Sequence, residues 1–80
     1  MRKVIKVKAL ENYNLELTFD NGAVKIKDMK IHLNEGVFKV LKKKELFNSV
    51  KLSCGAISWN NDIDLCADYL YETSQEIKNN

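Results

Sequence analysis

Asn14-Leu-Glu-Leu-Thr-Phe19, followed by Asp20-Asn21-Gly22 and Ala23-Val-Lys-Ile-Lys27, is the stretch of sequence that decides the fold. Apolar and polar residues alternate on both sides of the Asn-Gly pair, which is the period of β-strands with one buried face. Asn-Gly between two such runs favours a tight hairpin, because both residues tolerate a positive φ. The sequence therefore predicts two antiparallel strands joined by a short turn.

The same period continues toward the N-terminus, where Ile5, Val7 and Ala9 alternate with Lys6 and Lys8. We expect this segment to be the first strand of a three-stranded antiparallel meander. One face of the meander should be apolar, and its lysines should face solvent. The apolar residues expected on the buried face are Ile5, Val7, Ala9, Leu15, Leu17, Phe19, Val24 and Ile26.

The second half of the chain predicts short elements that close over this face. Residues 36–47 have a helical period, with Val37, Phe38 and Leu41 inward and Lys39, Lys42, Lys43 and Lys44 outward. A β-hairpin should follow, with strands around 50–53 and 56–59 and a turn at Cys54-Gly55. The last predicted element is a short helix over 67–72. Phe38, Leu41, Phe47, Trp59 and Leu70 should complete the core.

These elements predict an α+β fold: a three-stranded antiparallel meander, a short helical segment, a β-hairpin and a short C-terminal helix. We expect a single domain over residues 1–80, ordered from about 2 to 73, with 74–80 a frayed polar tail. A core of this size leaves no room for a deep cofactor pocket, so no cofactor is expected.

Composition places the chain among small globular proteins of the cytosol. It is 45% hydrophobic and 30% charged, with a net charge of +2. No apolar run approaches the ~18 residues of a membrane span. The first residues do not resemble a signal peptide. Two cysteines make no disulfide framework, which favours a reducing compartment.

Chemistry-bearing residues do not form a catalytic or metal-binding pattern. Asp62, Asp64 and Asp68 lack the glycine and glutamate that a calcium loop needs at its sixth and twelfth positions. Cys54, Cys66 and His32 lack zinc-site spacing, and we expect both cysteines to be buried or half-buried and His32 to lie at the surface or an edge. No nucleophile–base pair or phosphate-binding loop is present. The chain is therefore predicted not to be an enzyme.

Charge is unevenly distributed along the chain. Residues 1–44 hold eleven Lys/Arg and five Asp/Glu, a net of +6, whereas residues 45–80 hold two and six, a net of −4. One interpretation is that the lysines simply fill solvent-facing positions. The alternative is a nucleic-acid-binding module, whose phosphate contacts would come from Lys39, Lys42, Lys43 and Lys44.

Aromatic residues near the C-terminus also have two interpretations. Trp59, Tyr69 and Tyr71 either pack in and around the core or form the edge of a protein-binding surface, since Trp and Tyr are enriched in binding hot spots.

Three motifs in this order resemble a known family. They are Leu15-Glu-Leu-Thr-Phe19-Asp-Asn21-Gly22, then Gly36-Val-Phe38-Lys-Val-Leu41 with Phe47 after it, and finally Ile57-Ser-Trp59 with Asp64-Leu65-Cys-Ala-Asp68-Tyr-Leu70-Tyr71. Together, over roughly residues 4–73, they look like the small bacterial proteins grouped as domain of unknown function 2442. The chain departs from the family at Asn60 and Ala67, where members often carry proline, which weakens the local helix-start signal.

The resemblance implies a compact α+β domain that binds a partner or regulates one, and it implies a toxin–antitoxin-like pair encoded by neighbouring genes. The expected partner is then another small protein, the neighbouring gene product, with the present chain as the antitoxin-like member. A homodimer through an edge strand is an alternative. The partner-binding residues expected on this view are Trp59, Asp64, Asp68, Tyr69 and Tyr71.

Overall fold

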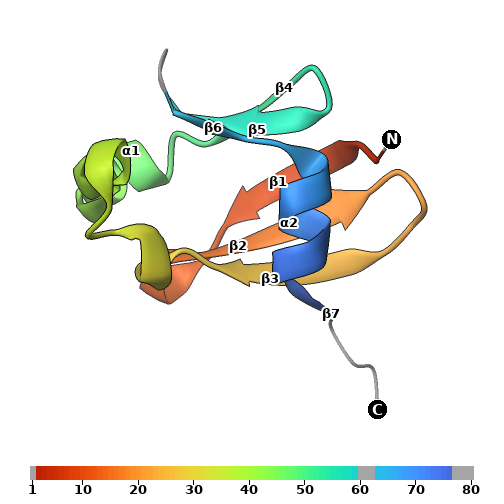
Figure 1. Ribbon diagram of the computed structural model, residues 1–80, viewed down its shortest axis with the longest axis horizontal. Coiled ribbons are helices and arrows are strands. Elements are labelled where there is room, and N and C mark those ends of the chain that lie inside the picture. Colours follow the sequence, from red (N-terminus) through yellow and green to blue (C-terminus); the bar gives the residue numbers. More distant parts are fainter. Residues whose placement is uncertain (1, 60–62, 77–80) are drawn as a thin grey trace.

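The computed structural model describes residues 2–59 and 63–76. The first half of the chain contains β1 (Val4–Ala9), η1 (Glu11–Tyr13), β2 (Asn14–Phe19), β3 (Val24–Asp28), η2 (Lys30–His32) and η3 (Gly36–Lys42), where η marks a 3₁₀ helix. The second half contains α1 (Lys44–Phe47), β4 (Lys51–Ser53), β5 (Ala56–Ser58), β6 (Asp64–Leu65), α2 (Ala67–Thr73) and β7 (Gln75–Glu76). The predicted α+β class is confirmed (Figure 1).

Strands β1, β2 and β3 form the predicted antiparallel meander, and β7 extends it to a sheet of order β1-β2-β3-β7. The β2–β3 hairpin is confirmed, but its turn differs from the one expected. Of the Asn-Gly pair only Gly22 has a positive φ, 88°. The N–H of Gly22 donates to Phe19 O (2.9 Å), and the N–H of Phe19 donates to Ala23 O (2.9 Å). The loop therefore has three residues and ends on a left-handed glycine.

The predicted β4–β5 hairpin is also present, and β6 joins it in a second sheet of order β4-β5-β6. Its turn has two left-handed residues, Cys54 (φ 51°) and Gly55 (φ 82°). The carbonyl of Gly55 accepts a 2.8 Å hydrogen bond from the N–H of Val4. The second sheet is thereby tied to the start of β1. In Figure 1 it lies above β1, while α2 crosses in front of the four-stranded sheet.

The expected burial of Ile5 is wrong, because β1 contains an irregularity. Val4 pairs with Phe19 and Lys6 pairs with Thr18, which leaves Ile5 as an extra residue in the ladder. A bulge of this kind shifts the alternation by one residue. Val4 is consequently buried, and Ile5 is 55% exposed.

The orientation predicted for β3 is also wrong. Lys25 and Lys27 lie on the covered face, opposite Leu17 and Leu15, and are 7% and 1% exposed. Val24 is 36% exposed on the other face. An alternating strand has two possible orientations, and the one adopted here needs polar partners for two ammonium groups.

Helix α2 supplies those partners. The ammonium of Lys25 donates to Tyr71 O (2.7 Å) and lies 3.7 Å from the Tyr71 ring centroid. The ammonium of Lys27 donates to Thr73 Oγ1 (3.0 Å) and lies 5.0 Å from the Tyr69 ring centroid. Aromatic faces and a helix-end carbonyl therefore replace water around the two charges.

The segment after η2 is helical, as predicted, but with the tighter period of a 3₁₀ helix. Three residues per turn place positions i and i+3 directly above one another. Phe38 and Leu41 form the inward row, and Leu41 is fully buried. Val37 and Val40 fall on a separate row and are 55% and 46% exposed. The predicted inward position of Val37 is therefore wrong, because it assumed 3.6 residues per turn.

The core lies between the four-stranded sheet, α2, α1 and the second sheet. The predicted closing residues Leu41, Phe47, Trp59 and Leu70 are buried, and Phe38 packs against them partly exposed. The indole N–H of Trp59 donates to Phe47 O (3.0 Å), which ties α1 to the residue that follows β5. The buried apolar residues are Val4, Leu15, Leu17, Phe19, Met29, Leu33, Leu41, Phe47, Ile57, Trp59, Ile63, Ala67 and Leu70.

The end of the chain is more structured than expected. Residues 75 and 76, which fall in the segment expected to fray, form β7 and pair with Ile26 and Lys25. Residues 77–80 lie outside the described residues. The short strand covers part of the outer edge of β3, which limits the edge available for aggregation.

Burial lowers the pKa of Lys27, and the negative charge of Asp28 partly opposes this shift. Since the folded-state pKa lies below 10.5, the folded protein binds fewer protons than the unfolded chain between those two values. The cost of burying the ammonium is therefore present at neutral pH and fades as the pH rises toward 10.5. We expect Lys27→Met to raise the free energy of unfolding by about 1 kcal/mol at pH 7, and this gain to shrink at alkaline pH. Urea denaturation over a pH series measures it.

The matched control is Lys6→Met, which makes the same change at an exposed position of β1. Its effect should stay within about 0.5 kcal/mol at every pH. Equal pH profiles for the two variants would contradict the assignment of a buried charge at position 27.

Candidate functional site

Helix η3 presents two outward rows side by side. One row carries Lys39 and Lys42, and the other carries Val37 and Val40, with Lys43 following at the helix end. All five side chains are exposed. We call these five residues the basic–aliphatic face. Aliphatic side chains exposed next to one another on a monomeric protein often mark an interaction surface.

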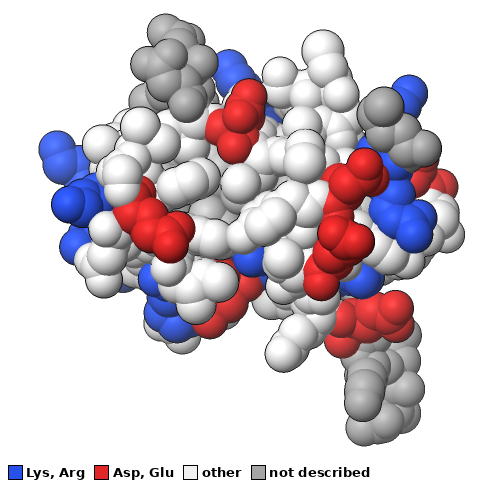
Figure 2. Space-filling model, in the orientation of Figure 1, with Lys and Arg blue, Asp and Glu red and all other residues white. Residues whose placement is uncertain are grey.

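The electrostatics of this face are one-sided. Residues 36–44 contain four lysines and no acidic residue. Figure 2 shows Lys and Arg side chains at the end of the molecule where η3 and α1 lie in Figure 1, with acidic side chains nearby. Around α2 the acidic side chains are mixed with basic ones, since Arg2, Lys25 and Lys27 contact its tyrosines. The one-sided charge is therefore confined to η3 and its end. Such a surface attracts an acidic partner.

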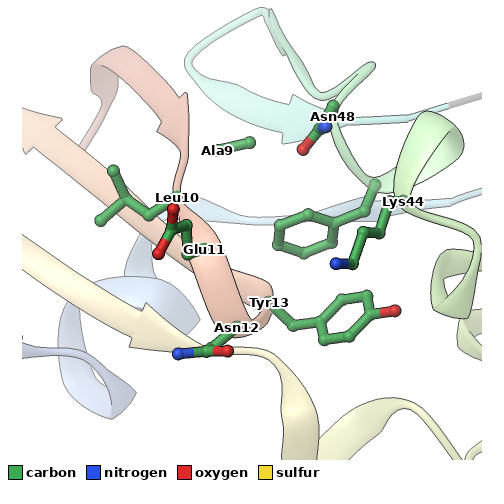
Figure 3. Close-up of a pocket in the computed structure, with 8 residues that line it drawn as sticks. Ala9, Leu10, Glu11, Asn12, Tyr13, Lys44 and Asn48 are labelled. Atoms are coloured by element: carbon green, nitrogen blue, oxygen red, sulfur yellow. The ribbon is translucent and has the colours of Figure 1, made fainter.

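Among the four lysines predicted to act together, the structure separates Lys44 from the other three. Lys39, Lys42 and Lys43 lie on the basic–aliphatic face. Lys44 begins α1 and reaches toward Tyr13 in a neighbouring groove (Figure 3).

The aromatic residues proposed for partner binding serve mainly to join elements of this chain. Trp59 is 2% exposed and lies in the core. Tyr71 is half-buried, with the Arg2 guanidinium and the Lys25 ammonium each 3.7 Å from its ring centroid. Its ring also packs edge-on against Phe19, with centroids 5.0 Å apart. Tyr69 is half-buried over Lys27.

Tyr69 also takes part in a hydrogen-bonded chain that the sequence did not predict. Its hydroxyl lies 3.0 Å from Nε2 of His32, whose Nδ1 lies 2.9 Å from Glu35 Oε1. The side chain of His32 is 12% exposed, so it is more buried than the surface or edge position expected. Contact with the tyrosine and with the Phe38 ring, 5.6 Å away, links η2 to α2 and η3.

The two acidic residues expected to bind a partner, Asp64 and Asp68, belong to different elements. Asp64 is exposed in β6, where it pairs with Ser58. Asp68 is exposed in the first turn of α2 and accepts a 3.2 Å hydrogen bond from the Arg2 N–H. Asp62 lies outside the described residues.

The positions expected for the cysteines are wrong, because Cys54 and Cys66 are both exposed free thiols. Cys54 lies in the left-handed turn of the β4–β5 hairpin, and Cys66 directly precedes α2. Within residues 2–59 and 63–76, no three His, Cys, Asp or Glu side chains gather as a metal site would require.

A groove of about 510 Å³ opens between the end of β1 and α1 (Figure 3). Figure 3 shows Leu10 and Glu11 on one side and Lys44 and Asn48 on the other. Apolar and polar groups are mixed along its walls. The lining residues are Ala9, Leu10, Glu11, Asn12, Tyr13, Lys44, Phe47 and Asn48.

The floor of this groove is built by a strained turn. Asn12 and Tyr13 both have φ of 59°, a left-handed conformation that a bulky residue such as tyrosine rarely adopts. The Tyr13 hydroxyl donates to Lys42 O, and its ring packs edge-on against Phe47 with centroids 5.2 Å apart. Contacts with η3 and α1 therefore hold the tyrosine in place, as strained residues require.

A second set of contacts, from Lys30 and Asp28, also holds the turn at Asn12 and Tyr13. The Lys30 ammonium donates to Asn12 O (3.0 Å) and lies 3.2 Å from Asp28 Oδ1. Asp28 also accepts the backbone N–H of Lys30 (2.8 Å). That hydrogen bond, helped by the nearby ammonium of Lys30, lowers the pKa of Asp28. The groove floor is thus fixed to the end of β3.

Comparison with protein families matches residues 4–76 to the family described as "Protein of unknown function (DUF2442)". The chain belongs to the DUF2442 family. The match spans the segment on which the sequence resemblance was based, so that resemblance is confirmed. No curated protein and no solved structure gives a significant match.

In the described part of this DUF2442 chain, no helix is long and apolar enough to span a membrane.

Tyr13→Phe tests the contact that holds the groove of this DUF2442 chain. The variant loses the hydrogen bond to Lys42 O and keeps the ring, so we expect the free energy of unfolding to fall by about 1 kcal/mol. Urea denaturation measures the change. Asn12→Gly is the control: it preserves the left-handed turn and should shift stability by no more than about 0.5 kcal/mol. If Tyr13→Phe were as stable as the wild type, the hydrogen bond from the Tyr13 hydroxyl would not contribute to stability.

Proposed function

We propose that this protein is a non-catalytic protein-binding module of the cytosol, whose basic–aliphatic face docks onto an acidic partner protein. The observation that carries the proposal is the pair of adjacent rows on η3, one of lysines and one of valines. The lysines supply long-range attraction, and the valines supply apolar area that is buried only in a complex.

The valine row favours a protein over a nucleic acid. Phosphate contacts need only the lysines, and base recognition relies mainly on Arg, Asn and Gln side chains. Val37 and Val40 are 55% and 46% exposed, and the sugar–phosphate backbone of a nucleic acid offers them much less apolar surface than a protein does. An acidic protein segment with aliphatic side chains satisfies both rows.

The family resemblance suggests where to look for this partner. We propose the product of the neighbouring gene, with the present chain as the antitoxin-like member of the pair.

Co-expression with the product of the adjacent reading frame, followed by calorimetric titration, tests this proposal. Val37→Ser/Val40→Ser and Lys39→Glu/Lys42→Glu should each weaken the complex by about tenfold or more, which corresponds to ~1.4 kcal/mol. Lys3→Glu/Lys51→Glu, with the same change in charge at two exposed lysines elsewhere, should leave the affinity within about threefold of wild type.

Absence of a complex between the two folded proteins counts against the proposal. A second titration, with a DNA or RNA duplex across a salt series, covers the nucleic-acid alternative. Duplex binding that is lost in Lys39→Glu/Lys42→Glu and unchanged in Val37→Ser/Val40→Ser would replace the protein partner with a nucleic acid.

A further inference from the structure

The groove in Figure 3 borders an edge of the four-stranded sheet, and the backbone alternation shows which groups face it. The N–H of Leu10 donates to Asn14 O (2.8 Å), so Leu10 faces β2. Two residues earlier, Lys8 also faces β2, opposite Glu16. By the same alternation, the N–H and C=O groups of Ala9 point away from β2.

Val7 has the same outward direction as Ala9, because it is two residues away. Among residues 2–59 and 63–76, no backbone hydrogen bond outside the β1–β2 ladder reaches the outward groups of either residue. The Gly55 carbonyl binds this edge only at Val4, near the beginning of β1. β4 and β5 lie near β1, but within the described residues β1 pairs only with β2. The second half of β1 is therefore an unpaired strand edge, and an unpaired edge is a template for another strand.

The groove continues from this open edge. Ala9 belongs to both, and α1 supplies the facing wall with Phe47, Asn48 and Lys44. A volume of about 510 Å³ is within the range of ~300–1,000 Å³ that ligand sites occupy. The groove offers apolar surface from Phe47, and its two charged lining residues, Lys44 and Glu11, have opposite signs. It therefore suits an apolar side chain better than a charged one.

Charge on β1 decides against a second copy of this chain as the occupant. Lys6 and Lys8 are exposed on the open face of the sheet. Antiparallel pairing of two β1 strands would bring these lysines close to their own copies, and like charges on adjacent strands are destabilising. A strand carrying acidic residues on the same face would be attracted instead, mainly by Lys6, because Lys8 already lies opposite Glu16 of β2.

We propose that the open edge of β1 and the adjoining groove bind an extended peptide segment in which apolar and acidic residues alternate. The segment would add a fifth strand beside Val7–Ala9. Its apolar side chains would enter the groove over Phe47, and its acidic side chains would lie beside Lys6 and Lys8. This site does not use the basic–aliphatic face and stands whether or not that face has a partner.

Backbone pairing and side-chain alternation have separate tasks in this arrangement. Hydrogen bonds to the outward groups of Val7 and Ala9 supply sequence-independent affinity, as in other cases of strand addition. Because successive side chains of a strand point to opposite faces, only an alternating sequence satisfies the groove and the lysines together.

Fluorescence anisotropy with short labelled peptides measures this binding on the full chain. The probe is a capped peptide, (Glu-Val) repeated four times. We expect it to bind at least about tenfold more tightly than a peptide of the same composition with all valines before all glutamates. It should also bind more tightly than the (Lys-Val) analogue. Equal binding of the alternating and block peptides would overturn the proposal.

Ala9→Pro removes the outward donor without touching the ladder to β2, which edge positions of this kind tolerate. The variant should fold and should bind the probe about tenfold more weakly. Lys8→Pro is the matched control: it removes a donor that faces β2 and should destabilise the fold itself.

Lys6→Glu/Lys8→Glu keeps the test decisive if Ala9→Pro does not fold. This variant should reverse the preference, so that the (Lys-Val) peptide binds better than the (Glu-Val) peptide. Hydrogen exchange adds a direct measurement, in which the probe should slow exchange at the Val7 and Ala9 amides. An unchanged preference, or no protection at those two amides, would overturn the proposal.

These outcomes are separate from those of the proposed function. A loss of probe binding in Lys39→Glu/Lys42→Glu as large as in Lys6→Glu/Lys8→Glu would place the peptide on the basic–aliphatic face and refute the strand-edge site. Failure of the neighbouring gene product to bind would leave the peptide result as it stands.

Discussion

Two lysines buried beneath α2 constrain how this helix lies over the four-stranded sheet, although burying their charge costs stability. The stems of Lys25 and Lys27 fill space beside Leu17 and Leu15, and their ammonium groups reach the carbonyl, hydroxyl and ring faces that the helix offers. A charge in this position is tolerated only while its partners stay in place. The helix is therefore located by polar contacts as well as by Leu70, and β7 follows from it directly.

Much of the fold could be predicted from sequence because it depends on local rules. The meander, its hairpin and the β4–β5 hairpin follow from period-two alternation and turn residues. The errors occur where a local rule had two solutions. Either face of β3 satisfies its alternation, and only α2 decides between them. Val37 would point inward in a helix with 3.6 residues per turn and points outward in one with three. The sequence of η3 does not show which of the two helix types forms.

In the candidate sites too, features that follow from local rules were predictable, and features set by tertiary contacts were not. Exposure of the four lysines was predictable, since lysine is rarely buried without a partner, whereas the separate direction of Lys44 depends on where α1 begins. The groove gave almost no signal in the sequence. Asn12 tolerates a left-handed conformation, but Tyr13 after it does not, and tertiary contacts to Lys42 and Phe47 override that preference.

Trp59 gives the molecule a built-in optical reporter. It is the only tryptophan in the chain, and its indole donates to the carbonyl of Phe47, the residue whose ring borders the groove. A buried indole emits at shorter wavelength than one in water, and its emission changes when the polarity or packing nearby changes. Excitation at its absorption edge therefore monitors unfolding, and tests the proposed occupancy of the groove, in one unlabelled sample without interference from a second indole.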